Sequence, residues 1–75
     1  MKAVKVTWID TVASVEGWED REGLRDMPPA KVHSLGFVVK DTKEYLTLAM
    51  TADGDSVHHR LTIPKVCIKK VRVLR

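Results

Sequence analysis

The chain has 75 residues, of which 44% are hydrophobic and 31% charged, which is typical of one small globular domain, residues 1–75, rather than of a disordered segment. This length excludes the large catalytic architectures, such as a barrel of eight strands and eight helices or a doubly wound sheet. A domain of this size buries only about 60% of its surface, so it often depends on a partner or on further copies of itself.

The net charge of +3 is unevenly distributed along the chain. Residues 1–30 carry four basic and six acidic side chains, whereas residues 31–75 carry nine basic and four acidic side chains. This asymmetry favours a basic surface that binds phosphate groups. It is also typical of solvated edge strands, whose lysines prevent aggregation.

Cysteine usage and hydropathy favour a protein of the cytoplasm. The single cysteine, Cys67, excludes an internal disulfide, which fits a reducing compartment. No apolar run approaches the ~20 residues that a membrane-spanning helix needs, so we expect no contact with a membrane. The first ten residues lack the apolar core and the cleavage site of a secretion signal.

The first element is a strand over residues 3–9, because apolar and polar side chains alternate there. The segment 10–34 that follows holds most of the acidic residues and two of the four glycines. Within it, Leu24 and Met27 are spaced to share one face of one or two helical turns over 18–27, although an internal glycine opposes a helix. We therefore expect a long, partly helical loop after the first strand.

Four further strands are predicted from alternating or short apolar runs; they cover residues 35–39, 45–50, 57–63 and 67–74. A turn at 41–43 joins the first two of them. The pair Asp53-Gly54 predicts a tight hairpin, because such turns need residues that tolerate a positive φ. Pro64-Lys65 interrupts the chain before the last strand, since proline cannot donate a hydrogen bond to a sheet.

Five strands with tight connections favour an all-β fold that closes into a small barrel, because closure removes exposed strand edges. The long first loop, the two hairpins and the short break before the last strand match SH3-like barrels. Over 45–50, apolar side chains point to both faces of the strand, and a barrel this small is not expected to bury both. We therefore expect some of this surface to lie against another copy of the chain or under the long loop, and we favour a homo-oligomer.

Two segments resemble the two Sm motifs. Gly36-Phe37-Val38-Val39-Lys40-Asp41, followed by Tyr45-Leu46-Thr47-Leu48, has the glycine, apolar strand, aspartate and second apolar strand of the first motif. The segment 63–74 has the isoleucine, short break and valine-rich strand of the second motif. Lys65 stands where that motif usually has glycine, and Pro64 where it often has arginine. The resemblance implies a five-stranded SH3-like or Sm-like barrel more than it implies RNA binding of the Sm type.

The chain also resembles a group of short, mostly uncharacterised bacteriophage proteins. The shared features are Trp8 and Asp10 in the first strand, Gly17-Trp18 in the loop, Gly36, and Ile63-Pro64-Lys65 near the end. This resemblance implies a viral accessory protein of the host-cell cytoplasm. If such a protein bound a small nucleotide, it would be similar to viral sponges that sequester cyclic-nucleotide immune signals.

No residue pattern predicts catalysis or a metal site. His58 and His59 are expected to point to opposite faces of a strand, and no paired Cys or His spacing of a zinc site is present. Phosphate-cradling and nucleophile motifs are also missing. Cys67 is expected as a small core residue. We therefore expect no enzyme activity, no catalytic residue, no metal and no cofactor.

The candidate phosphate-binding side chains are the cations of the last two strands and the break between them: Arg60, Lys65, Lys69 and Lys70. Arginine binds a phosphate with two hydrogen bonds, and lysine supplies a point charge. Trp18 and His59 are candidates to stack on bases, but Trp18 is also suited to pack over one end of the barrel. These residues favour an oligomer that binds a nucleic-acid strand or a small nucleotide.

A protein-interaction module is the alternative. The acidic loop 16–26 contains Trp18, Arg21 and Arg25, and tryptophan and arginine are enriched among the residues that dominate protein interfaces. In this alternative, the loop around Trp18 docks on a host protein and the basic strands are only a solvated surface.

Overall fold

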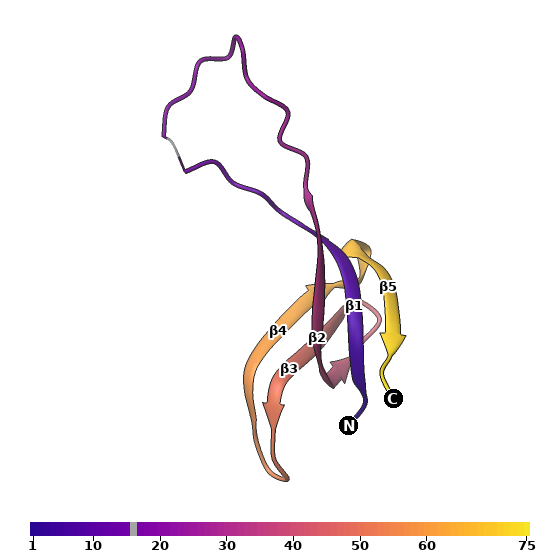
Figure 1. The fold of residues 1–75 in the computed structure, drawn as a ribbon. Coiled ribbons are helices and arrows are strands. Elements are labelled where there is room, and N and C mark those ends of the chain that lie inside the picture. Colours follow the sequence, from indigo (N-terminus) through magenta and orange to yellow (C-terminus); the bar gives the residue numbers. More distant parts are fainter. Residues whose placement is uncertain (16) are drawn as a thin grey trace.

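The structure is a computed structural model that describes residues 1–15 and 17–75. It consists of one antiparallel sheet with the strand order β4-β3-β2-β1-β5 (Figure 1). The elements are β1 (Ala3–Asp10), β2 (Ala30–Asp41), β3 (Tyr45–Ala52), β4 (Val57–Pro64), η1 (Lys65–Cys67) and β5 (Ile68–Val73). The predicted all-β fold with five strands is therefore confirmed. No helix of the described residues is long and apolar enough to cross a membrane.

The sheet curls without closing on itself. β4 pairs with β3 and β5 pairs with β1, so these two strands form the free edges of the sheet. The three residues of η1 turn the chain from one edge of the sheet to the other. The closed barrel that the sequence predicts is therefore not formed by the described part of a single chain.

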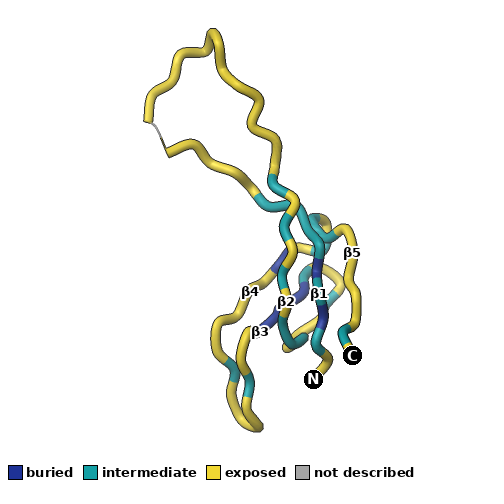
Figure 2. Tube along the Cα trace, viewed as in Figure 1, coloured by how far each residue is buried: buried dark blue, intermediate teal, exposed yellow. Residues whose placement is uncertain are grey.

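The core lies inside the curl of the sheet. Its buried side chains come from β1, β3 and β4: Val4, Val6, Leu46, Leu48 and Ile63. Because β1 and β4 share this core although two strands separate them in the sheet, the sheet must bend around it (Figure 2). Partly buried apolar side chains pack against the core from outside: Trp8, Val38, Cys67 and Ile68. The prediction that Cys67 is a small core residue agrees with this position.

β3 is buried on both faces. All side chains from 46 to 49 are buried, and the hydroxyl of Thr47 shares a hydrogen bond of 2.8 Å with that of Thr62. The expectation that one chain leaves part of segment 45–50 uncovered is therefore wrong for 46–49, because Thr47 and Ala49 are small enough for neighbouring strands to cover. Met50 of the same segment does stay exposed, as does Leu35 of β2.

The connection between β1 and β2, residues 11–29, projects from the end of the sheet as an extended arm (Figures 1 and 2). All of its described residues are exposed, and none of them is helical. The helical turns predicted over 18–27 are not formed, because Gly23 adopts a φ of 78° and both Leu24 and Met27 face solvent. Without a buried face, so short a helix has nothing to stabilise it.

The predicted hairpin between β3 and β4 is confirmed, but an aspartate rather than a glycine shapes its turn. Asp53 Oδ1 accepts hydrogen bonds from the backbone N–H groups of Asp55 at 2.8 Å and Ser56 at 2.7 Å. It also accepts one from the Ser56 hydroxyl at 3.1 Å. Gly54 is not among the residues with a positive φ. These hydrogen bonds to the carboxylate lower the pKa of Asp53 below its ordinary value of 3.8.

We expect Asp53→Ala to destabilise the protein at neutral pH, because three donors of the turn lose their acceptor. Since folding lowers this pKa, the stabilisation is complete above the ordinary value and is lost as the pH falls through the lowered one. The difference in unfolding free energy between variant and wild type should therefore shrink as the pH falls below 3.8, the ordinary pKa of the carboxyl. Urea unfolding at each pH measures it. Asp55→Ala is the control, and an equal loss there would contradict the account.

Candidate phosphate-binding groove

A shallow groove of about 540 Å³ crosses the outer face of β1, β2 and β5, opposite the core. Five lysine and arginine side chains, one histidine, one threonine and one isoleucine line it: Lys5, Thr7, Ile9, Lys31, His33, Lys69, Lys70 and Arg72. No carboxylate is present in this lining. We refer to these eight residues as the basic groove.

The register of the sheet brings these side chains together. Thr7 of β1 lies between His33 of β2 and Lys70 of β5, and Lys5 lies opposite Arg72. Side chains of a strand alternate between its two faces, so these residues point away from the buried valines of β1. Residues from three separate parts of the sequence therefore form one cationic surface.

A β-bulge adds a further cation to this surface. The pairing of β1 with β5 shifts its register between Thr7 and Trp8, which lie opposite Lys70 and Ile68. In a regular strand, Lys69 and Lys70 would point to opposite faces. Because the bulge places an extra residue on β5, both lysines line the groove.

The charges of the basic groove are available to a ligand. In the described part of the chain, none of its lysines or its arginine forms an ion pair; the ion pair found there joins Lys65 to Asp41, outside the groove. The ring of His33 is held by a hydrogen bond of 2.9 Å between its Nδ1 and Thr7 Oγ1. Unpaired cations on one surface repel each other, so an anion that binds between them is stabilised by all of them.

The structure separates the four cations that the sequence offers for phosphate binding. Lys69 and Lys70 lie in the basic groove. Arg60 lies on β4, opposite Ala49 of β3, and is not part of the groove lining. Lys65 lies in η1 beyond the end of β4. The prediction therefore named two of the five lysines and arginines that come together, and its other two residues lie elsewhere.

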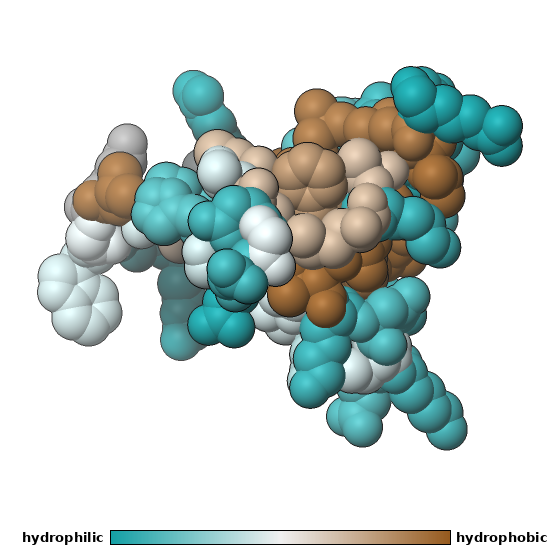
Figure 3. Space-filling model, turned by 90° about the horizontal axis from the view of Figure 1, so that it is seen from below, coloured by the Kyte–Doolittle hydropathy of each residue, from teal (hydrophilic) through white to brown (hydrophobic). Residues whose placement is uncertain are grey.

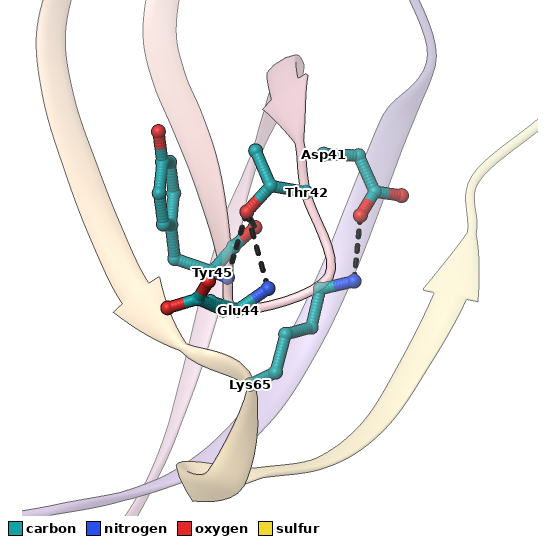
Figure 4. A network of polar contacts seen from close by, with 5 residues as sticks. All are labelled: Asp41, Thr42, Glu44, Tyr45 and Lys65. Atoms are coloured by element: carbon teal, nitrogen blue, oxygen red, sulfur yellow. Dashed lines mark hydrogen bonds and ion pairs between the residues drawn. The ribbon is translucent and has the colours of Figure 1, made fainter.

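Lys65 has a structural partner. Its Nζ donates a hydrogen bond of 2.6 Å to Asp41 Oδ1 (Figure 4). Its backbone N–H donates to the carbonyl of Glu44 at 2.8 Å. Thr42 Oγ1 accepts from the backbone N–H groups of Glu44 and Tyr45 and so closes the turn between β2 and β3. Lys65 thus ties η1 to this turn, which reduces its availability to a phosphate.

A second hollow, of about 410 Å³, lies beside this ion pair near both chain ends. Its lining is mainly apolar: Val4, Val38, Leu46, Val71 and Val73, with Lys2, Asp41 and Lys65. Figure 3 views this end of the molecule and shows brown apolar surface flanked by hydrophilic side chains. Of its two lysines, Lys65 is already paired with a carboxylate, so the hollow suits an anion less well than the basic groove does.

His58 and His59 do not diverge as the sequence predicts. Their ring centroids are 3.8 Å apart, because His59 adopts a φ of 56°, which interrupts the alternation of β4. Among the described residues, no group of three or more His, Cys, Asp or Glu side chains is placed to hold a metal ion. His59 therefore contacts its neighbour and lies outside the basic groove.

Trp18 lies on the arm and is fully exposed. The alternative in which its ring packs over an end of the barrel is therefore not found in this structure. Arg21 and Arg25 of the same loop are exposed as well, while residue 16 of the predicted interaction loop 16–26 lies outside the described residues. The ring thus remains free to contact another molecule.

Sequence reasoning missed Lys5, Lys31, His33 and Arg72. Each lies on the polar face of a strand whose other face is mainly apolar, as Lys5 does between Val4 and Val6. That alternation was the available signal, but the pairing of β1 with both β2 and β5 was needed to bring the residues together. Comparisons of the chain with models of protein families, with curated proteins and with solved structures find no match.

Proposed function

We propose that this protein is a non-enzymatic binding protein for a phosphate-bearing nucleotide ligand, which it holds in the basic groove. One observation carries the proposal: five lysine and arginine side chains converge on a groove with no carboxylate in its lining. Arg72 suits two hydrogen bonds to one phosphate, and the lysines add point charges around it. His33 offers a flat ring for a base beside those cations.

The size of the basic groove favours a small nucleotide or a short single strand as the ligand. Along β1 the groove extends from Lys5 to Ile9, which is about 13 Å at ~3.3 Å per residue. Across β2, β1 and β5 it extends over two strand spacings, or about 10 Å. A small nucleotide would make the protein similar to viral sponges for cyclic-nucleotide signals, as the bacteriophage resemblance implies.

We propose further that the protein acts as a homo-oligomer. Two features support this proposal: the free edges of β4 and β5, and apolar side chains that are exposed on one copy, such as Met50 and Val73. Free edges and exposed apolar surface are commonly covered by symmetric association. In such an oligomer, free strand edges of different copies could pair and close a barrel, since the two edges of a single chain stay apart.

Titration of the protein with a labelled single-stranded oligonucleotide and with a cyclic dinucleotide, at several salt concentrations, tests the proposed ligand class. If five cations contact phosphates of a strand, the logarithm of the binding constant falls with the logarithm of salt with a slope of about −3.5. A small nucleotide with two phosphates should give a slope shallower than about −2. Binding of neither probe at low salt would contradict the proposed function.

The second candidate function is the docking of a host protein on the arm. The specific observation in its favour is Trp18, which is fully exposed between acidic residues on a projecting segment. Tryptophan is enriched among the residues that carry most of the binding energy of protein interfaces. In this case the oligonucleotide would not bind, and Trp18→Ala would abolish capture of the host partner while leaving the sheet intact.

A further inference from the structure

The arm and the basic groove carry opposite charges. Residues 11–29 contain five acidic and two basic side chains. The basic groove carries five lysine and arginine side chains and no carboxylate. Both surfaces are exposed, and among the described residues neither contains an ion pair that would balance its charge. The two surfaces are therefore electrostatically complementary.

The arm also presents apolar side chains to solvent. Val15 and Trp18 are 95% and 103% exposed, and Leu24 and Met27 are more than half exposed. The basic groove offers matching contacts, because Ile9 and the aliphatic stems of its lysines form an apolar floor beneath the charges. The indole of Trp18 is suited to lie against a lysine or arginine of such a surface by a cation–π contact.

The geometry points to the groove of a second copy rather than to the groove of the same chain. The arm begins and ends where Asp10 pairs with Ala30, and from there it leaves the sheet and points away from it (Figure 1). Pro28-Pro29 stiffens the returning limb just before that pair, which opposes a sharp fold back over β1.

We propose that the arm of each copy docks in the basic groove of another copy, so that two chains exchange arms in a reciprocal, two-fold symmetric contact. Such a contact uses the same two surfaces on both subunits, as two-fold interfaces do. It places Trp18 and the carboxylates near 19–22 over the lysines of the partner subunit. It goes beyond nucleotide binding, because the occupant of the groove is a segment of this chain.

The arm and a phosphate ligand would then compete for the same cations. A nucleotide that neutralises Lys69, Lys70 and Arg72 removes the charges that attract the arm, so binding of the ligand should release it. The arm thus covers the basic groove until a more highly charged ligand arrives. Self-association is expected to weaken on addition of an oligonucleotide, and to weaken at about 1 M salt, where the Debye length is only ~3 Å.

Two charge-reversed variants test the proposal. The arm variant carries Glu19→Lys, Asp20→Lys and Glu22→Lys, so its arm and its groove are both basic. The groove variant carries Lys31→Glu, Lys69→Glu and Lys70→Glu, so its arm and its groove are both acidic. Sedimentation velocity measures the association of wild type, of each variant alone and of an equimolar mixture, and circular dichroism confirms that each variant folds.

We expect the wild type to self-associate, each variant alone to associate more weakly than the wild type, and the mixture to regain the lost association through heterodimers, since both arm–groove contacts become attractive again only there. Monomeric wild type, unchanged association of the arm variant alone, or a mixture that associates no more strongly than the separate variants would each overturn the proposal. If the groove variant fails to fold, the arm variant alone still tests the proposal, because its substitutions lie on exposed residues of the arm, outside the sheet.

The same arm variant separates this inference from the proposed function. Its basic groove is intact, so it should bind the oligonucleotide at least as tightly as the wild type does, because the competing arm is gone. An arm variant that associates more weakly than the wild type and fails to bind any nucleotide probe would refute nucleotide binding and leave the arm exchange standing. An arm variant that binds the probe and still self-associates like wild type would refute the arm exchange and leave nucleotide binding standing.

Discussion

Reversal of two charges in the basic groove, by Lys70→Glu with Arg72→Glu, should weaken binding of a single-stranded oligonucleotide by about 100-fold. Each substitution removes a charge-assisted contact to phosphate, worth about 1.4 kcal/mol or more, and a tenfold change in affinity corresponds to that amount. Both side chains are exposed on the outer face of β5, so the fold should be unaffected. The salt slope should also become shallower, because fewer counterions are released.

A matched double variant separates local contacts from net charge. Arg60→Glu with Lys43→Glu changes the net charge of the protein by the same amount, but both residues lie outside the basic groove. We expect this control to weaken binding only slightly, through the long-range field of the protein. Equal losses for the two double variants would mean that the ligand responds to overall charge and that the groove is not the site. Fluorescence anisotropy at constant salt measures both.

Gly36→Ala should destabilise the protein by about 1–3 kcal/mol, although a glycine replaced by alanine in a strand is usually neutral or stabilising. The added Cβ would lie 2.9 Å from the carbonyl oxygen of Ala49 and 3.2 Å from the Cβ of Leu48. The first contact is with backbone, so β3 itself would have to shift away from β2. Since Leu48 belongs to the buried core, that shift would disturb the packing inside the curl.

Gly54→Ala provides the control for this prediction. Nothing lies within 4 Å of a Cβ at Gly54, and its φ is not positive, so the substitution should change the stability by less than about 0.5 kcal/mol. Thermal or urea unfolding of the two variants beside wild type measures the difference. If Gly36→Ala were as stable as Gly54→Ala, the close approach of β3 to Gly36 would be refuted.

β1 and the first half of β2 have the alternating burial that a period-two pattern in the sequence predicts. Val4 and Val6 lie on the buried face of β1, and the partly exposed lysine between them marks the other face. The turns were equally predictable, since Pro64 ends β4 and Asp53 begins the hairpin turn. The prediction of helical turns in the arm was wrong, because helical spacing of apolar residues stabilises a helix only where another element buries those residues. The arm has no such neighbour.

The candidate site was only partly predictable, because it depends on pairings between distant strands. Lys69 and Lys70 are easily recognised as adjacent cations in the sequence, but they share a face only because of a bulge that the sequence does not predict. Lys31 and Lys5 belong to the same surface only because β1 pairs with β2 along its whole length. Arg60 and Lys65 look equivalent to these lysines in the sequence, and the register alone separates them.

The measurement that tests the central claim most directly is a nuclear magnetic resonance titration of the labelled protein with a short single-stranded oligonucleotide and with a cyclic dinucleotide. Binding in the basic groove predicts that the largest shifts of amide resonances fall on β1 and β5 at Lys5, Thr7 and 69–72, and on β2 near His33. Resonances of the β3–β4 hairpin should stay in place. Shifts concentrated at Arg60 and Lys65, or no shift with either ligand at low salt, would contradict the account.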